Sequence, residues 1–304
     1  MQKSSTKNNN KPIKMAVFSH DAGGAQVLSG YLKENNINYD GRIIGPAKQV
    51  FHQKNLKVVE GNLITTINEA DVVITSTSWQ SRLELNAIRY SKDICKKSIS
   101  ILDHWVNYTE RFKLDGKLML PDEIWVCDNH ALCLAKKNFP RMKIRKIKNY
   151  DIVDFQKKFM QKTNYYPPEE SFLFLNDNTS EVRELLRNEN DIKSQDEISF
   201  QNLLMAIKHK KIKDSLITIR LHPSEKLHCE PWYAKYLNDR IRISDQVNFS
   251  DDLHHHKFIC GTDSMGMYYA SKASKEVISC EKFHNVECSI PNKGILSLKE
   301  WCDL

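Results

Sequence analysis

The feature that most constrains the fold is a repeated alternation between short apolar runs and stretches with helical spacing. An apolar run at residues 14–19 precedes a segment in which Val27, Leu28, Tyr31 and Leu32 recur on one helical face. Strands that alternate with helices in this way predict a parallel sheet with both faces covered. The strands expected in the first half of the chain are residues 14–19, 39–45, 55–61, 70–78, 97–105, 121–129 and 142–149.

A polar segment at residues 157–171, which contains Pro167 and Pro168, interrupts this alternation and predicts a linker. The alternation then restarts. The strands expected after the linker are residues 171–177, 214–223, 240–245, 256–264 and 275–281.

This organisation predicts an α/β fold with two Rossmann-like domains that face each other across a cleft. The length of 304 residues is ample for two such domains. The expected divisions are a disordered tail over residues 1–14, an N-terminal acceptor-side domain over 15–160 and a C-terminal donor domain over 170–304.

The charge balance favours an anionic partner. The chain carries 45 Lys and Arg against 38 Asp and Glu, a formal net charge of +7, which suits an anionic ligand or an anionic membrane surface. The excess lysine is spread through polar segments such as 208–214, as on a solvated surface, and we expect no nucleic-acid partner. No apolar run approaches the roughly 18 residues of a spanning helix, and the polar start lacks the apolar region of a secretory signal. These features predict a cytoplasmic protein with peripheral contact with the inner membrane.

The cysteines and histidines do not form a metal-binding pattern. None of the eight cysteines forms a CxxC pair, which argues against a structural zinc site. The three adjacent histidines at residues 254–256 would point in different directions on a helix. We therefore expect no metal site.

Polar clusters follow most of the expected strands, and the carboxyl ends of parallel strands share one edge of a sheet. After the first strand the sequence reads His20-Asp21-Ala22-Gly23-Gly24. The two glycines permit a ligand to approach the backbone. Either Asp21 or His20 could take a proton from an acceptor hydroxyl. Alternatively, Asp21 caps the helix that follows.

Two further clusters in the first half are candidates for binding an acceptor. Asp103 or His104 offers a second base. Aromatic side chains in these clusters either stack on a sugar ring or pack in the core. The acceptor-binding candidates are Asp103, Trp105, Tyr108, Ser78 and Trp79.

In the second half, His222 lies at the end of an expected strand, where it can donate to a phosphate and stabilise a departing nucleotide. Residues 261–264 form a turn before a helix, whose free N–H groups favour an anion. Ser264 adds a hydroxyl donor, and an ordinary capped helix is the alternative. The donor-binding candidates are Gly23, Gly24, Asn176, Arg220, Pro223, Ser224, Gly261, Thr262, Asp263 and Ser264.

These residues resemble the GT-B glycosyltransferases of bacterial capsule and lipopolysaccharide biosynthesis. The His-Pro pair at 222–223 and the serine-bearing segment 261–264 are similar to the His-Pro and Ser motifs of bacterial sialyltransferases and polysialyltransferases. The resemblance implies that His222 and Ser264 contact the nucleotide phosphate of the donor. It also implies a base from the first domain and chemistry without a metal or another cofactor. The single acidic residue of His20-Asp21-Ala22-Gly23-Gly24 departs from the acidic pair that these enzymes commonly carry.

We therefore expect a glycosyltransferase that moves a sugar from a nucleotide-activated donor to a hydroxyl of a glycan or lipid-linked glycan. CMP-linked acidic sugars are favoured over UDP and GDP sugars. In the expected reaction, Asp21 or His104 deprotonates the acceptor, while His222 and Ser264 stabilise the leaving phosphate. Two alternatives stay open: a nucleotide-sugar epimerase of the same fold, and a non-catalytic nucleotide-sugar-binding subunit of an assembly. The oligomeric state is left open.

Overall fold

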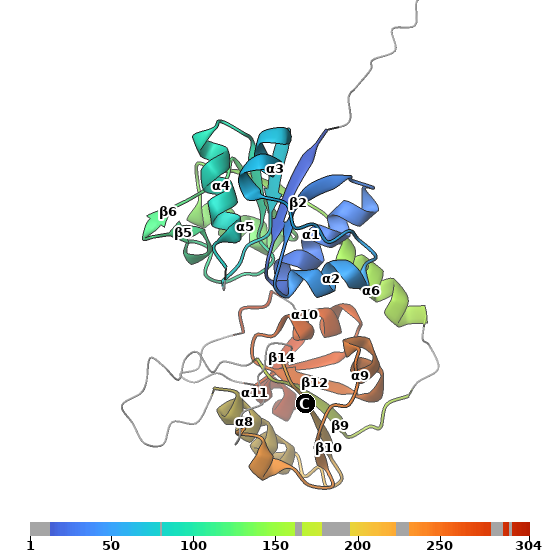
Figure 1. The fold of residues 1–304 in the computed structure, drawn as a ribbon. Coiled ribbons are helices and arrows are strands. Elements are labelled where there is room, and N and C mark those ends of the chain that lie inside the picture. The colour runs from blue at the N-terminus through green and yellow to red at the C-terminus, as the bar shows by residue number, and fades with distance from the viewer. Residues whose placement is uncertain are drawn as a thin grey trace, which may run out of the picture. The chain divides into compact units, whose positions relative to one another are not determined.

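Parallel sheets organise the chain. In the computed structural model, the described residues are 13–79, 81–161, 166–177, 195–222, 231–280, 288–291 and 294–304. The chain divides into two compact units, Met1–Asp151 and Ile152–Leu304 (Figure 1). Each unit contains a six-stranded parallel sheet, as the alternation in the sequence predicts.

The first unit has the strand order β2-β1-β3-β4-β7-β8. Its main-sheet strands are β1 (Met15–Ser19), β2 (Tyr39–Ile43), β3 (Val72–Thr75), β4 (Ser98–Ile101), β7 (Glu123–Val126) and β8 (Lys143–Lys146). Because the order reverses between β1 and β3, the loops after these two strands diverge and leave room at the carboxyl edge of the sheet. A small antiparallel hairpin, β5 (Lys113–Leu114) with β6 (Lys117–Leu118), lies outside this sheet.

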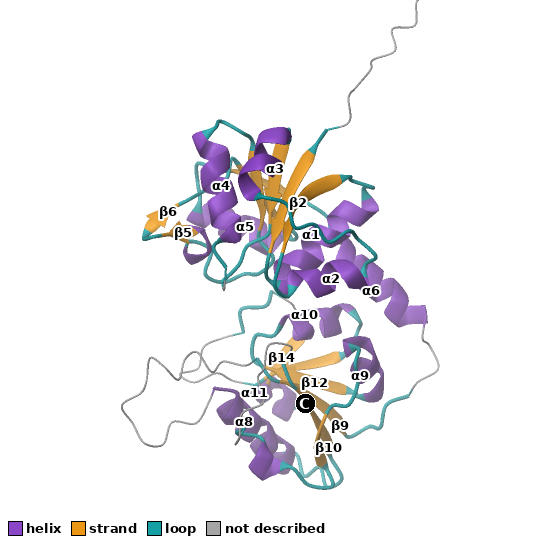
Figure 2. Cartoon of the chain, viewed as in Figure 1, coloured by secondary structure: helices purple, strands orange, loops and turns teal. Residues whose placement is uncertain are grey.

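Helices cover both faces of the first sheet (Figure 2). Alternation along β1 sends Val17 to one face and Ala16 and Phe18 to the other. Val17 packs in the cluster that contains helices α1 (Ala22–Glu34) and α2 (Ala47–Gln53). Phe18 packs in the cluster that contains α3 (Leu63–Glu69) and α4 (Leu83–Asp93). The remaining helical segments of this part are η1 (Glu110–Phe112), α5 (Asn129–Asn138) and the start of α6 (Tyr150–Gln161).

The second unit has the strand order β11-β10-β9-β12-β13-β14. Numbered within the unit, this is the 3-2-1-4-5-6 order of the Rossmann fold. The order reverses between β9 and β12. The strands are β9 (Ser171–Leu175), β10 (Leu216–Arg220), β11 (Ile241–Ile243), β12 (Phe258–Gly261), β13 (Glu276–Ser279) and β14 (Ile295–Ser297).

The core of the second unit is rich in aromatic rings. Phe172 and Phe174 of β9 are fully buried; Phe174 contacts Phe200 edge-to-face, and Phe172 contacts Trp301 in the same way. The helical segments of this unit are α8 (Gln195–His209), η3 (Ala234–Tyr236), α9 (Phe249–His255), α10 (Met265–Lys272) and α11 (Leu298–Asp303). Phe155 of α6 packs on Phe249 and Tyr269, so the later turns of α6 belong to this unit.

Three sequence predictions differ from the structure. Residues 55–61 do not form a strand; they contribute one bridge, from Glu60 to Arg42, and their apolar Val59 packs into the core. The first residues of the predicted linker, 157–161, are helical as part of α6. The sheet does not end at β13, because β14 pairs with it and α11 follows. Because β14 and α11 are short, the hydrophobic periodicity of their residues gives little indication of their secondary structure.

The predicted tail over residues 1–14 lies outside the described residues except for Ile13 and Lys14. No helix among the described ranges is long and apolar enough to cross a membrane.

The two glycines of the first α1 turn are required by packing. A Cβ on Gly23 would lie 2.5 Å from Asp103 Oδ2, and a Cβ on Gly24 would lie 2.6 Å from Ser76 Cβ. The start of α1 therefore lies directly against the loops that follow β3 and β4. The contact of both glycines with a donor stays a prediction.

We expect Gly24→Ala to lower the free energy of unfolding by about 1 to 3 kcal/mol, since the added methyl group overpacks this contact. Urea unfolding measures the effect. The same substitution in a Ser76→Gly background should cost less, because the second change removes the clashing Cβ. Equal costs in the two backgrounds would show that Ser76 is not what excludes the methyl group.

Candidate functional site

The carboxyl edge of the first sheet brings His20 and Asp21 together. Nδ1 of His20 lies 2.6 Å from Oδ1 of Asp21, and the two side chains are 17% and 23% exposed. Asp21 occupies the N-cap position of α1, yet its carboxylate makes no capping hydrogen bond. It instead accepts from the Ser78 hydroxyl at 2.7 Å and from the Trp79 N–H at 2.8 Å. Asp21 is therefore placed to hold the His20 ring in one orientation.

Gly45 makes room for the His20 ring. Its φ is +58°, and a Cβ there would lie 2.6 Å from His20 Nε2. The Ala47 N–H also donates to the His20 carbonyl oxygen at 2.8 Å. The turn after β2 thus packs against the His20 ring and backbone. The sequence reasoning missed Gly45, although the Gly45-Pro46 pair is a turn signal.

A buried ion pair lies next along the same edge. Arg111 donates to Asp103 Oδ1 at 3.2 Å, and both side chains are less than 10% exposed. Thr77 bridges the pair, since its hydroxyl donates to Asp103 at 3.1 Å and accepts from Arg111 at 3.1 Å. The Asp103 carboxylate is therefore bound to the guanidinium of Arg111. The sequence reasoning missed Arg111. His104, the other predicted base, is half-buried, and its Nδ1 accepts from the Trp105 N–H.

The aromatic candidates separate into buried and exposed rings. Trp105 is 7% exposed and donates from Nε1 to Asp128, and Tyr108 is 3% exposed with its hydroxyl directed at the Ala131 carbonyl. Their rings pack in the core, which corrects the predicted stacking of these two side chains on a sugar. Trp79, in contrast, is 52% exposed, and the Arg111 guanidinium lies 5.3 Å from its ring centroid.

Glu84, in the first turn of α4, is a further buried acid at this edge. It is 2% exposed. Its Oε1 accepts from the His20 backbone N–H at 2.8 Å and from the Ser76 hydroxyl at 3.1 Å. Burial raises the pKa of Glu84 to about 7, against the lowering effect of hydrogen bonds from its own backbone N–H, from the His20 N–H and from Ser76. The sequence contains one indication of this burial. Glu84 stands four residues before the apolar Ile88, so both residues lie on the same face of the helix.

The carboxyl edge of the second sheet gathers several donor-binding candidates. Asp177, after β9, accepts from the Thr262 hydroxyl and from the Asp263 N–H at 3.2 Å. Ser264 is the N-cap of α10 and accepts from the Gly266 N–H at 3.3 Å. Ser264 therefore caps the helix, which is the alternative that the sequence analysis gave for it. The hydroxyl group of Ser264 acts as an acceptor in this cap, so its hydrogen can still be donated to another group. Asp263 Oδ1 accepts from the Ser289 N–H at 2.7 Å.

Buried backbone contacts fix the remaining candidates of this edge. Asn176 is 4% exposed, and its N–H donates to the Arg220 carbonyl oxygen at 3.0 Å. Gly261 lies against Met267, whose Sδ would be 3.1 Å from an added Cβ. These contacts align the ends of β9, β10 and β12 before α10 begins.

His222 follows β10 at the same edge. The residue is exposed over more than a third of its surface. Atoms around its ring still desolvate it enough to lower its pKa, while Asp196 opposes this change. This shift favours the neutral imidazole, which carries one ring N–H. Pro223 and Ser224 lie outside the described residues.

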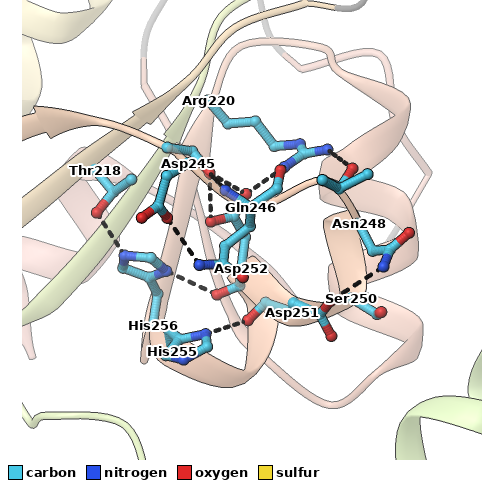
Figure 3. A network of polar contacts seen from close by, with 12 residues as sticks. Thr218, Arg220, Asp245, Gln246, Asn248, Ser250, Asp251, Asp252, His255 and His256 are labelled. Atoms are coloured by element: carbon cyan, nitrogen blue, oxygen red, sulfur yellow. Dashed lines mark hydrogen bonds and ion pairs between the residues drawn. The ribbon is translucent and has the colours of Figure 1, made fainter.

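Arg220 is turned away from this group. Its guanidinium pairs with Asp252, which is 1% exposed, and donates to the carbonyl oxygens of Gln246 at 3.0 Å and Val247 at 3.3 Å (Figure 3). The Ser244 hydroxyl also donates to Asp252 at 2.7 Å. Arg220 therefore anchors the loop between β11 and α9, where the sequence analysis expected it to bind the donor.

The three histidines at the end of α9 have local partners. Each Nδ1 contacts the carbonyl oxygen four residues earlier. Figure 3 shows these contacts for His255 and His256, together with the contact of His256 Nε2 with the Thr218 hydroxyl at 2.7 Å. Across the described residues, no group of His, Cys, Asp and Glu has the arrangement of a metal site.

No protein-family model matches the sequence, and no curated protein matches it. Solved structures do match its fold. UDP-GlcNAc 2-epimerase from Methanocaldococcus jannaschii, in complex with UDP-GlcNAc and UDP, matches with a TM-score of 0.61 and 14% identity, over 96% of this chain and 91% of that chain. A putative UDP-N-acetylglucosamine 2-epimerase from Listeria monocytogenes matches with a TM-score of 0.62 and 12% identity, over 96% and 86% of the two chains. The glycotransferase of kitacinnamycin matches with a TM-score of 0.52 and 10% identity, over 94% and 86%.

These proteins are GT-B enzymes, and the chain has the same fold of two Rossmann-like units. At such low identity the likeness concerns the fold.

The buried Glu84 should make stability depend on pH. The native carboxyl keeps its proton to about pH 7, whereas the unfolded one loses it near 4.5. The native state then binds more protons in this window, so the stability of the wild type falls as pH rises through it. We expect Glu84→Gln, which does not titrate, to gain about 2 to 3 kcal/mol relative to the wild type between pH 5 and pH 8. Urea unfolding at both values measures this, and a constant difference would contradict the buried, proton-holding state.

Proposed function

We propose that the chain is an enzyme that transfers a glycosyl group from a nucleotide-activated sugar to an acceptor hydroxyl. The observation that carries this proposal is the His20–Asp21 pair, which lies where the strand order of the first sheet reverses. Such an edge is where open α/β sheets bind their ligands. The GT-B fold of the matched enzymes supports the same assignment.

In the proposed reaction, Asp21 keeps a proton on Nδ1 of His20, so that Nε2 can accept the proton of the acceptor hydroxyl. The acceptor oxygen then forms a bond to the anomeric carbon as the bond from that carbon to the nucleotide phosphate breaks. His20 is therefore the proposed base, and Asp21 is its positioning residue. The exposed Trp79 ring offers the acceptor an apolar face beside this pair.

The leaving nucleotide carries the negative charge that develops in the reaction. We assign its stabilisation to the His222 imidazole, the Ser264 hydroxyl and the N–H groups at the start of α10. The matched epimerase structure contains UDP-GlcNAc and UDP. We accordingly propose a UDP-linked donor in place of the CMP-linked donor that the sequence analysis favoured.

A second candidate function is epimerisation of a UDP-sugar without an acceptor. It is favoured by the TM-scores of 0.61 and 0.62 to UDP-GlcNAc 2-epimerases. Incubation with UDP-GlcNAc alone distinguishes the two functions. An epimeric UDP-sugar formed without an acceptor identifies an epimerase, whereas release of UDP only after a glycan is added identifies a transferase.

We expect His20→Ala to lower turnover by about 10²- to 10⁴-fold, the usual contribution of a general base. UDP affinity should stay unchanged, because His20 does not contact the nucleotide in this proposal. Steady-state kinetics and calorimetry measure the two quantities. The control is His52→Ala, an exposed histidine of the same unit, and equal turnover in the two variants would exclude His20 as the base.

We expect His222→Ala to weaken UDP binding about 10- to 100-fold, since a hydrogen bond to a charged group contributes roughly 1.5 to 3 kcal/mol. Calorimetric titration with UDP measures the dissociation constant. His209→Ala is the matched control, because His209 is an exposed histidine of the same unit. A dissociation constant for His222→Ala equal to that of the control would remove His222 from the nucleotide site.

A further inference from the structure

A dense group of cations, which has no role in the chemistry proposed above, lies along one border of the first unit. Residues 129–150 contain no Asp or Glu. They form α5, the turn after it and strand β8. We call their exposed cations the basic edge: Lys136, Lys137, Arg141, Lys143, Arg145, Lys146 and Lys148. Of the 45 Lys and Arg of the chain, the 38 outside the basic edge equal the 38 Asp and Glu in number. The basic edge therefore matches the whole formal net charge of +7.

Little of this charge is neutralised by neighbouring side chains. In the described part of the chain, Lys143 is the one member of the basic edge that pairs with an acid, since its Nζ lies 2.9 Å from Glu123. Lys146 donates to a neutral side-chain amide oxygen at 2.7 Å. Arg145 and Lys148 lie over aromatic rings, which carry no net charge. Six cations are thus left without an acidic partner among the described residues.

The two acids that flank this segment in the sequence are bound elsewhere. Asp128 accepts from the Ala131 N–H at 2.7 Å and from Trp105 Nε1 at 2.8 Å. Asp151 pairs with Lys54 of the α2 C-terminus. Neither carboxylate forms an ion pair with the basic edge.

Protection of an open sheet edge explains part of this pattern. β8 ends the strand order and pairs only with β7, and lysines on such a strand discourage pairing with another chain. This role accounts for the cations of β8 itself. It does not account for Lys136 and Lys137, in the last turn of α5, or for Arg141, in the turn that follows. The charge extends beyond what protection of the strand requires.

The local structure suits a flat anionic surface better than a nucleic acid. Single strands are held by exposed aromatic rings on which bases stack, but Phe139 and Trp125 are buried and Tyr150 is half-buried. The major groove of a duplex admits a helix or a two-stranded ribbon. The basic edge instead occupies one helix turn, a loop and a single strand. A bilayer with anionic lipids requires neither feature, because it attracts exposed cations by charge.

We propose that the basic edge is a docking surface for an anionic lipid bilayer. Each Lys or Arg near such a surface strengthens binding about fivefold. Six cations without an acidic partner then suffice for reversible binding that depends on salt. This inference goes beyond the proposed function, since the first unit would bind the bilayer whether or not a sugar is transferred.

Co-sedimentation of the full chain with vesicles tests the proposal without a substrate. We expect binding to vesicles of equimolar phosphatidylcholine and phosphatidylglycerol, and no binding to vesicles of phosphatidylcholine alone. Raising the ionic strength from about 0.1 M to about 1 M shortens the Debye length from about 10 Å to about 3 Å, so salt should release the protein. Equal binding to the two kinds of vesicle, or binding to neither, would overturn the proposal.

A triple variant locates the surface. Lys136→Gln, Lys137→Gln and Arg141→Gln together remove three exposed cations that lie outside β8. We expect the affinity for the anionic vesicles to fall roughly 100-fold, while urea unfolding stays like that of the wild type, because none of the three side chains is buried. An unchanged affinity would contradict the proposal.

The matched control removes the same charge from the second unit. Lys208→Gln, Lys211→Gln and Lys213→Gln together replace three exposed lysines near the end of α8. This variant should bind the anionic vesicles almost as well as the wild type does. Equal weakening in the two triple variants would assign the binding to the net charge of the chain and would exclude a local docking surface.

Gel-shift assays with single-stranded and duplex DNA give the competing outcome. We expect no DNA complex that depends on the basic edge. If the wild type bound DNA, the Lys136, Lys137 and Arg141 variant released it and the anionic vesicles bound neither protein, the basic edge would be a nucleic-acid surface and the proposal would fail.

Activity assays separate this inference from the proposed function. If the vesicles bind through the basic edge but no sugar nucleotide is turned over, the docking surface stands and the proposed function fails. If turnover depends on His20 but the vesicles do not bind, the inference about the basic edge is the one that fails.

Discussion

The polar edge of each unit depends on one constraint, the parallel pairing of β1 with β3 in the first unit and of β9 with β12 in the second. Parallel pairing sends the carboxyl ends of all strands to one edge, and the reversal of strand order separates the loops there. Polar side chains that are far apart in the chain must then meet and satisfy one another. In the first unit, Asp21 and Ser78 are 57 residues apart in the sequence, yet 2.7 Å separates their side-chain oxygens.

The two edges use their polar groups differently. At the first edge, buried acids hold neighbouring loops: Asp103 through Arg111, and Glu84 through the His20 N–H and Ser76. At the second edge, Asp177 joins the loops after β9 and β12. These bonds cost conformational freedom but fix the loops before a ligand arrives, which lowers the entropy loss on binding. The His20 side chain is 17% exposed, and His222 is exposed over more than a third of its surface.

Several residues that the sequence marked as functional serve structure instead. Arg220 stands beside His222 in the chain, but alternation along β10 directs its side chain to Asp252 and the loop before α9. Trp105 and Tyr108, in the loop after β4, are buried in the core. Gly23 and Gly24 lie against the side chains of Asp103 and Ser76. In each case, residues from other parts of the chain determine the contacts of the residue.

The sequence alone determined the α/β alternation, the two Rossmann-like units and the edge at which the polar clusters gather, because hydrophobic periodicity and turn residues are local signals. It could not separate Asp21 as a helix cap from Asp21 as a partner of His20, since the choice depends on Ser78 and Trp79 arriving from another strand. The sequence analysis did not single out Glu84. Only the tertiary structure buried its carboxyl against the turn of β1, because burial is a property of long-range packing and not of local pattern.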